Sequence, residues 1–279
     1  MDQIATGQLR PWEQPIWKPA KGQTRVLLYL LLIHLLALTG LILYPIPSLP
    51  VLGVAILLAC LGGVGTTVCY HRTMAHRSVK LNKAVEHFLI FWAMFNGSGS
   101  PRSWVANHRH HHSHSDQPDD ISSPRQGGFW WAHMRWLYQS SLPDEKKWAP
   151  EMTTPEYNFW SHAQMFIVLL SLTCGLVHSW EAFFWVGAIR MVYTLHVQCL
   201  ANSLTHLGYD QEGDASINLW WLGPFQLTAW GENWHRNHHH RAGSAQFGWR
   251  WYQIDLGWYA IWFLESLGLA SSVRRLKSS

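Results

Sequence analysis

The segment VLLYLLLIHLLALTGLILY, residues 26–44, decides the fold class of this chain. It carries no Asp, Glu, Lys or Arg, and its length is close to the roughly 20 residues that a helix needs to cross a bilayer. The segment VLGVAILLACLGGVGTTVCY, residues 51–70, has the same character and follows a short turn rich in proline. A second pair of apolar segments lies at 160–178 and 182–201. The sequence therefore predicts an all-α membrane protein with four transmembrane helices in two hairpins.

Composition alone does not separate a membrane protein from a large soluble enzyme, since 279 residues with 48% hydrophobic content suit both classes. The length of the four apolar segments favours the membrane protein. Residues 1–25 lack the apolar core and cleavage site of a signal peptide, so we expect an N-terminal extension there. Because the sequence shows neither a repeat nor a linker, we expect a single domain, 1–279, in which residues 71–159 and 202–279 form a helical cap.

Basic residues predict the orientation in the membrane. They flank the apolar segments on one side only, at Arg10, Lys18, Lys21, Arg25, Arg72, Arg77, Lys80, Lys83, Arg274, Arg275 and Lys277. The two short turns contain neither Lys nor Arg. Because Lys and Arg accumulate on the cytoplasmic side of membrane proteins, we expect both termini, the cap and the active site to face the cytoplasm. The net charge of +4 is modest, and no basic stripe indicates a nucleic-acid partner.

Histidine is the second unusual feature of the sequence. The chain contains 18 histidines, and half of them fall into short clusters. These clustered residues are His71, His76, His108, His111, His112, His206, His235, His238 and His239. Residues three and four apart share one face of a helix, so the spacing predicts that each of the larger clusters points its rings in one direction. The set is too large for one ion, since about four protein ligands hold a zinc ion, and it therefore predicts two metal ions.

The interval between His71 and His76 is the exception to this spacing. Five residues on a regular α-helix place two side chains about 140° apart. We therefore expect these two histidines where a helix ends or unwinds.

Several motifs resemble the membrane fatty acyl desaturase family, in particular its stearoyl-type Δ9 branch and the related bacterial and cyanobacterial enzymes. HRTMAHRS (71–78) is similar to HRxxxHRS, HRHHHSHSD (108–116) to HRxHHxxSD, and GENWHRNHH (231–239) to GExWHxNHH. NSLTHLG (202–208), GFWWAHMRW (128–136) and WRWYQIDLGW (249–258) resemble three further segments of that family. The chain departs from the family pattern after the third motif, where Arg236 and Arg241 add charge beside the histidines.

The resemblance implies a site and a reaction. Carried over residue by residue, it implies two iron ions held by the nine clustered histidines, with Asn202 reaching a metal through water. It also implies dioxygen as co-substrate and a cis double bond, at the Δ9 position, as the product. Removing hydrogen from an unactivated methylene needs a strong oxidant that no ordinary side chain supplies, so the chemistry is assigned to the metal centre and not to a catalytic side chain.

The same resemblance implies the partners. The acyl substrate would arrive bound to coenzyme A, a carrier protein or a lipid of the bilayer. Electrons would come from a separate donor such as a ferredoxin, a rubredoxin or cytochrome b5, because the chain carries no dinucleotide or haem motif. Five basic residues are candidates for attracting an acidic donor: Arg102, Arg109, Arg135, Lys146 and Lys147.

Small residues in the second apolar segment have two readings. Ala55, Ala59, Gly62 and Gly63 could line a channel for the acyl chain, and close helix packing explains them equally well. Within the fourth segment, Arg190 and His196 are expected to face the protein interior and to line a functional path.

Two other functions remain open at this point. The first is a di-iron hydroxylase acting on acyl or alkyl chains, because the same oxidant can place oxygen on the substrate. The second is a non-redox membrane metal protein, such as a zinc hydrolase or a metal transporter. A hydrolase would use fewer histidines together with a carboxylate base, and a transporter would place its ligands inside the spanning helices.

Overall fold

The computed structural model describes residues 9–208, 214–221 and 227–276. Its α-helices are α1 (Thr24–Leu43), α2 (Leu49–Val64), α3 (Lys83–Phe95), α4 (Pro101–His114), α5 (Pro124–Gly127), α6 (Trp136–Gln139), α7 (Glu145–Trp148), α8 (Pro155–Thr173), α9 (Trp180–Ala182), α10 (Arg190–Ser203), α11 (His235–His240) and α12 (Leu256–Ser266). Three π-helical segments cover Gly65–Ala75, Trp131–Arg135 and Phe183–Ile189, and short 3-10 helices cover Pro11–Glu13, Pro150–Met152 and Cys174–Val177. The strands are β1 (Lys80–Leu81) and β2 (Ala270–Ser271).

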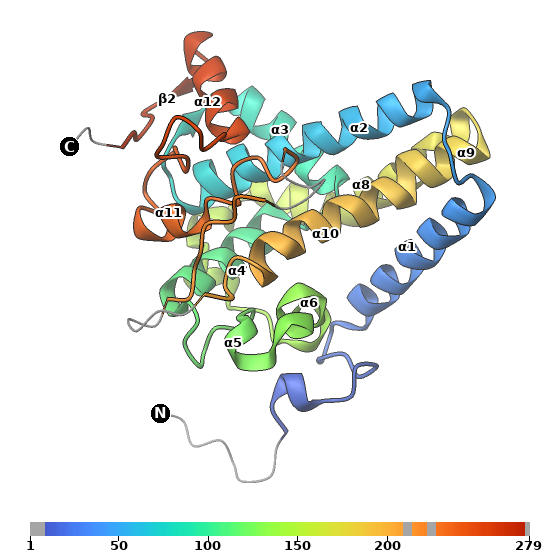
Figure 1. Cartoon of the computed structure of the whole chain (residues 1–279), viewed down its shortest axis with the longest axis horizontal. Helices are drawn as coiled ribbons and strands as arrows, with labels where there is room; N and C mark the ends of the chain where they lie inside the picture. The colour runs from blue at the N-terminus through green and yellow to red at the C-terminus, as the bar shows by residue number, and fades with distance from the viewer. Residues whose placement is uncertain (1–8, 209–213, 222–226, 277–279) are drawn as a thin grey trace.

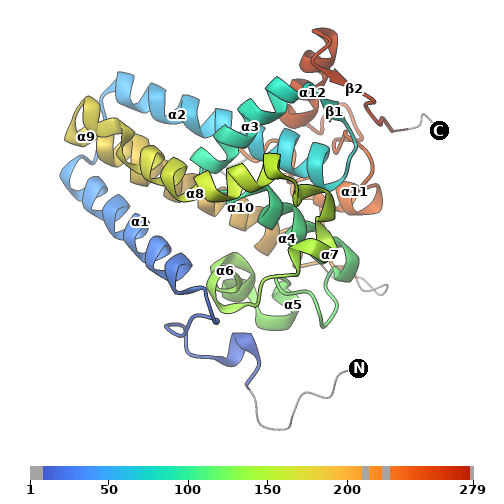
Figure 2. The same ribbon diagram turned by 180° about the vertical axis from the view of Figure 1, so that it is seen from behind.

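Four long apolar helices form a bundle, which confirms the predicted fold class. They cover Thr24–Leu43, Leu49–Ala75, Pro155–Val177 and Trp180–Ser203, and each is long and apolar enough to cross a membrane. The first pair and the second pair are each joined by a short connection, and both connections lie at the same end of the bundle, near α9 (Figure 1). α3 packs beside α2 and α8, and the helices α4, α5, α6, α7, α11 and α12 gather at the opposite end, as the reverse view also shows (Figure 2). This end is the cap.

The surface of the bundle fits a lipid environment. Only 22% of the most apolar part of Thr24–Leu43 is buried inside the protein. Leu28, Leu31, Leu35 and Leu38 recur every three or four residues on α1 and are all exposed. A continuous stripe of this kind would be costly in water and is neutral in hydrocarbon.

The C-terminal part of the chain is tied to the end of the second spanning helix. β1 and β2 pair antiparallel, with Lys80 opposite Ser271 and Leu81 opposite Ala270. The backbone N–H of Arg274 donates to the carbonyl of Ser78 at 2.8 Å. These bonds bring the segment that follows α12 against the segment that follows the first histidine motif.

Arg190 faces the protein interior, as predicted. It is only 3% exposed, and its guanidinium donates to the carbonyls of Val186 and Phe95 and to the side chains of Asn96 and Ser171. Phe95 and Asn96 form the C-terminal end of α3, where a positive charge is favourable. Arg190 therefore caps α3 and does not line the cavity described below.

His196 belongs to a chain of three imidazoles that joins separate elements. Its Nε2 lies 3.2 Å from Nε2 of His34 on α1, and its Nδ1 lies 2.9 Å from Nε2 of His133. Nδ1 of His133 lies 3.0 Å from the hydroxyl of Ser203 on α10. The chain connects α1, α10 and the π-helical segment Trp131–Arg135, which indicates a role in holding the cap on the bundle.

Candidate metal centre

The second spanning helix ends in a π-helical segment, Gly65–Ala75, which carries His71, and His76 follows it directly. The N–H of His76 donates to the carbonyl of His71 at 3.1 Å, five residues back, as in a π-helix. The helix ends at Ala75, with His76 as its capping residue. The two rings lie 5.0 Å apart between their centroids. The predicted helix end is thus found, and a widened last turn also brings the two rings to the same side.

The second cluster lies on α4, where the spacing acts as predicted. The helix starts after Ser100, whose hydroxyl accepts from the N–H of Ser103, and Pro101 occupies its first turn. Three of its histidines, His108, His111 and His112, point toward the cluster, with ring centroids of His108 and His112 4.5 Å apart.

The third cluster lies on α11, a short helix held in place by buried polar contacts. Trp234 precedes it and donates its indole N–H to the carbonyl of Ile254 at 2.8 Å. Asn237, on its buried face, donates to the carbonyl of Phe247 at 2.8 Å. His206, just after α10, completes the set.

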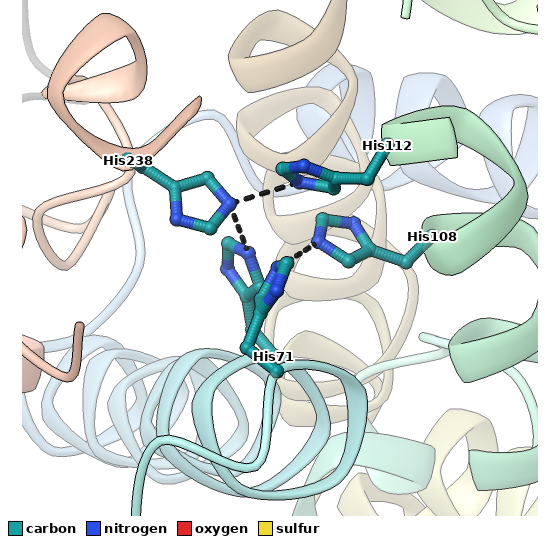
Figure 3. A group of neighbouring side chains, drawn as sticks. His71, His108, His112 and His238 are labelled. Atoms are coloured by element: carbon teal, nitrogen blue, oxygen red, sulfur yellow. Dashed lines mark hydrogen bonds between the residues drawn. The ribbon is translucent and has the colours of Figure 1, made fainter. Parts of the chain in front are cut away.

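Within the described residues, all nine predicted histidines come together in two adjacent groups. The first group has five members, His71, His76, His108, His112 and His238, and the second has four, His111, His206, His235 and His239. Within each group the ligand nitrogens all lie within 4.8 Å of one another. In Figure 3 the labelled rings of His71, His108, His112 and His238, from three separate elements, point toward one another. The two groups meet where the rings of His112 and His239 lie 4.3 Å apart.

Four carboxylates orient these rings from outside. The Nδ1–H groups of His71, His111, His206 and His239 donate to Glu232, Asp120, Asp116 and Asp214, respectively, at 2.8–3.0 Å. A ring that donates through Nδ1 presents the lone pair of Nε2 on its other side. Each of these contacts therefore fixes one histidine in the form that binds a metal ion.

The arrangement of the Nε2 atoms fits positive ions at the centre of each group. Nε2 of His238 lies 3.0 Å from that of His71 and 2.9 Å from that of His112. Nε2 of His235 lies 2.9 Å from that of His206 and 3.1 Å from that of His239. A neutral ring that donates through Nδ1, as His71, His206 and His239 do, has no proton on Nε2, so these contacts cannot all be hydrogen bonds. Among the described residues, the buried Nε2 of His111 has no hydrogen-bond partner. Converging lone pairs of this kind repel one another unless a cation lies between them.

Burial and mutual repulsion favour the neutral form of five rings in the cluster. Both effects hold the pKa values of five rings well below the usual range: His76, His108, His112, His235 and His238. The carboxylate of Asp120 is held instead in its charged form. Burial would raise the pKa of Asp120, but the charge of His111 and its hydrogen bond lower it. Neutral imidazoles held by ionised carboxylates are the forms that bind a metal.

Removing one orienting carboxylate should weaken metal binding. Asp120 accepts from Nδ1 of His111 and from the N–H of Asp116 and Ser122, so Asp120→Asn removes the charge that fixes the ring. We expect metal affinity to fall about 10- to 100-fold, the usual effect of losing such a partner. Metal titration of the purified protein measures this. The exposed neighbour Asp119 supplies the control, and equal losses in Asp119→Asn and Asp120→Asn would contradict the assignment.

Acidification should destabilise the metal-free protein. Burial lowers the pKa of His239 to about 4, against the pull of Asp214. In the unfolded chain this histidine takes up a proton below about pH 6.5, whereas in the folded chain it does so only near pH 4. The free energy of unfolding therefore decreases as the pH is lowered from about 6.5 toward 4. Thermal unfolding of chelator-treated protein between pH 7.5 and 5 tests this. A melting temperature that is constant or rises toward pH 5 would be evidence against a neutral buried cluster.

A cavity of about 630 Å³ adjoins the histidine cluster, a volume typical of ligand sites. His71, His108, His111 and His235 contribute to its wall. So does Ala59, which precedes His71 by roughly 18 Å along the same helix. The cavity therefore extends from the cluster into the spanning bundle.

The small residues of the second spanning helix divide between the two readings. Ala59 and Gly63 line the cavity. Ala55 packs instead in the apolar core, and a Cβ at Gly62 would lie only 2.1 Å from Cγ of Asn96. Close packing therefore explains Ala55 and Gly62, and it also explains Gly63, where a Cβ would lie only 2.1 Å from Nε1 of Trp230. The channel role of Ala59 and Gly63 stays a prediction that their place in the cavity wall supports.

Asn202 also lines the cavity, next to the second group of histidines. Its amide nitrogen donates to the carbonyls of Ser122 and Ala132, at 3.0 and 2.8 Å. Because both N–H groups are engaged, any further bond must be accepted by its Oδ1, and a water molecule can donate such a bond.

The orienting carboxylates are functional residues that the sequence did not identify. Glu232 and Asp116 lie inside the quoted histidine motifs, and Asp120 follows four residues later. The signal available was the usual pairing of a metal-bound histidine with a carboxylate, but the partner of each ring depends on loops that bring distant residues together.

Comparisons with known proteins agree with this geometry. A family model described as fatty acid desaturase matches residues 47–262. The chain is 36% identical to delta-9 acyl-lipid desaturase 1 of Arabidopsis thaliana over 234 residues, covering 81% of this chain and 75% of that protein. It is 36% identical to sn-1 stearoyl-lipid 9-desaturase of Anabaena variabilis, covering 80% and 83%. It is 38% identical to acyl-CoA 5-desaturase AL21 of Anemone leveillei, covering 78% and 70%.

Proposed function

Because the chain belongs to the fatty acid desaturase family, we propose that it introduces a cis double bond at the Δ9 position of a saturated acyl chain bound in the cavity beside the histidine cluster. The predicted family is thereby confirmed. The observation that supports the reaction most directly is the shared wall: four clustered histidines and the spanning helices line the same cavity. A methylene group bound there lies next to the ligand nitrogens.

We propose that the two groups of histidines hold two iron ions, five ligands on one and four on the other, with Asn202 completing the second through water. With dioxygen and external electrons, iron at these positions would supply the oxidising power that an unactivated methylene requires. The protein holds the rings with Glu232, Asp116, Asp120 and Asp214, and these contacts maintain the ligand geometry throughout the reaction.

The cavity wall performs the remaining tasks. It restricts the acyl chain to a narrow space, which places one pair of adjacent carbons near the cluster. Burial of the cluster excludes bulk water from the reacting carbons. Protein residues therefore contribute positioning and water exclusion, and no side chain is assigned a direct role in hydrogen removal.

The acyl carrier and the position of the double bond rest on the relatives. Two of those compared are named for lipid-bound substrates and the 9 position, and one is named for acyl-CoA and the 5 position. We propose a lipid-bound acyl chain and the Δ9 position for this chain, since a substrate held in the bilayer reaches a cavity that extends among the spanning helices.

We also propose a single domain with both termini and the cap on the cytoplasmic side. The two short connections of the bundle lie together and contain neither Lys nor Arg, whereas the described cap carries most of the basic residues. Single cysteines introduced at exposed Lys146 and at exposed Leu49 would test this by labelling with an impermeant reagent. If the reagent labels Lys146→Cys and not Leu49→Cys from outside intact cells, the orientation is the opposite of the one proposed.

Expression in a host that lacks unsaturated lipids tests the reaction. We expect a new monounsaturated acyl chain with its double bond at carbon 9, located by mass spectrometry of derivatised lipids. Loss of two hydrogens identifies a desaturase, while a gain of one oxygen would identify a hydroxylase and overturn the proposal. The extract should also be analysed by lipid class, because product confined to acyl-CoA would contradict a lipid-bound substrate.

A further inference from the structure

The outer face of α11 and the loop that follows it form a basic and aromatic surface. Arg236, Arg241, Arg250 and Arg274, with Trp249 and Trp251, make up this α11 patch, and all six are exposed. The guanidinium of Arg241 lies 5.5 Å from the ring centre of Trp249. Nη1 of Arg274 lies 4.0 Å from the position that a Cβ at Gly243 would occupy. Arg241 and Arg274 therefore lie against one loop, residues 241–250, which ends at Arg250, and Arg236 lies on the helix that precedes it.

None of these four arginines forms an ion pair with a carboxylate among the described residues. The carboxylates nearest to them in the chain are paired elsewhere: Glu232 holds a histidine, Asp255 binds Arg72, and Glu265 binds Arg275. The charge of the patch is thus left for a partner.

The basic residues singled out from the sequence are mostly unavailable. Arg102 pairs with Glu145, and Arg109 binds Glu151 and the carbonyl of Met74. Arg135 donates to carbonyls of the N-terminal segment. Only the other two of the five, Lys146 and Lys147 on α7, are exposed without an ion pair among the residues that the structure describes. The three arginines are thus engaged within the protein, and the attraction of a donor by these five residues stays a prediction.

The α11 patch lies one helix away from the metal centre. Arg236 and His240 occupy the exposed face of α11, and His235, His238 and His239 occupy the face toward the cluster. A helix with its side chains is about 10 Å thick. A second connection runs through Phe247, which is fully buried and has its ring centre 4.3 Å from that of His238. A redox group placed on the patch would therefore be separated from the histidines of α11 only by that helix, and from His238 also by the ring of Phe247.

The position of α11 favours a water-soluble partner over the lipid surface. α11 lies at the end of the molecule opposite α9 and the short connections of the bundle, in both views (Figures 1 and 2). The four spanning helices run between these two ends. At this end of the molecule, exposed side chains of α11 and of the loop after it are accessible to a partner in the aqueous phase.

We propose that the α11 patch is the docking surface for an acidic, one-electron carrier protein. The inference rests on the proposed function, which needs such a carrier. Each turnover converts CH2–CH2, O2, two electrons and two protons into CH=CH and two water molecules. Two carrier molecules are oxidised in turn, and each gives one electron to the metal centre. The two protons come from water. Opposite charges on the two surfaces speed the encounter and orient the carrier, with a strong dependence on salt.

Charge reversal on the patch tests this. The double variant Arg241→Glu/Arg250→Glu, metal-loaded and in nanodiscs, is mixed with reduced plant-type 2Fe–2S ferredoxin, and ferredoxin oxidation is followed by stopped flow. We expect the second-order rate constant to fall at least tenfold at low ionic strength and to approach the wild-type value at high salt. The milder variant Arg241→Gln/Arg250→Gln should fall less. Metal content and melting temperature report whether either variant remains folded.

Lys146→Glu/Lys147→Glu is the matched control, because it changes the net charge equally at exposed positions on α7. An unchanged rate in the α11 variant, or a larger loss in the α7 variant, would overturn the proposal. If the rate loss in the α11 variant depends instead on the anionic lipid content of the nanodisc and not on the salt concentration, that result would assign the patch to binding of lipid. A single turnover of chemically reduced protein with dioxygen needs no carrier and so does not depend on docking. If no unsaturated product forms in that experiment, the proposed reaction is refuted and the docking surface is not.

Discussion

Replacing His239 with alanine should abolish formation of unsaturated product. His239 lies between the two groups: its Nε2 is 3.1 Å from that of His235, and its ring stacks on His112 at 4.3 Å. Its loss removes one of four ligands from the second group and leaves Asp214 without its histidine partner. His108→Ala should have the same effect through the first group, where Nε2 of His108 lies 2.7 Å from that of His76.

The measurement combines fatty acid profiling with elemental analysis of the purified variants. We expect no detectable product and a loss of about one metal ion per protein, since each variant damages one of two sites. His240→Ala is the control on the same helix, because His240 is exposed and belongs to neither group. Full activity in His239→Ala or His108→Ala would count directly against a metal-centred reaction. A matching loss in His240→Ala would point to disruption of α11 as a whole.

The architecture was largely predictable because it follows from two local properties of the sequence. Apolar length identifies the four spanning helices, since the bilayer sets the same requirement for every protein. The three- and four-residue spacing in HRHHHSH identifies the shared face on α4, because helical geometry is constant. Neither inference needs knowledge of which segments meet in space.

The parts that could not be predicted depend on contacts between distant segments. The rings of His71 and His76 converge only because the helix widens into π geometry, which a spacing rule for α-helices does not include. Glu232 reaches His71 across more than 160 residues of sequence, and Asp116 reaches His206 across 90. The same limit applies to surface charge: only the fold shows that Arg102 and Arg109 form ion pairs, while Arg236 and Arg241 form none with the residues that the structure describes.

Ala59→Phe should exclude long acyl chains while leaving the metal centre intact. Ala59 lines the cavity roughly 18 Å before His71 along the helix, so an added ring fills the part of the cavity inside the bundle. Overfilling a packed space costs about 1–3 kcal/mol, which corresponds to roughly a tenfold to hundredfold loss of product from the natural chain length. Chains shorter by several carbons should lose less, because they do not reach the filled region.

Profiling the products formed from acyl chains of graded length measures this effect. Leu57→Phe is the control on the same helix, since Leu57 is 57% exposed on the lipid-facing surface and an added ring there leaves the cavity unchanged. Metal content and melting temperature separate the two readings of the small residues. If Ala59 only allows close packing, Ala59→Phe lowers stability and metal content together and affects all chain lengths equally. If it lines the channel, both stay near the wild-type values and only the preferred chain length shifts. The second result is expected because Ala59, unlike Ala55, borders the cavity and not the apolar core.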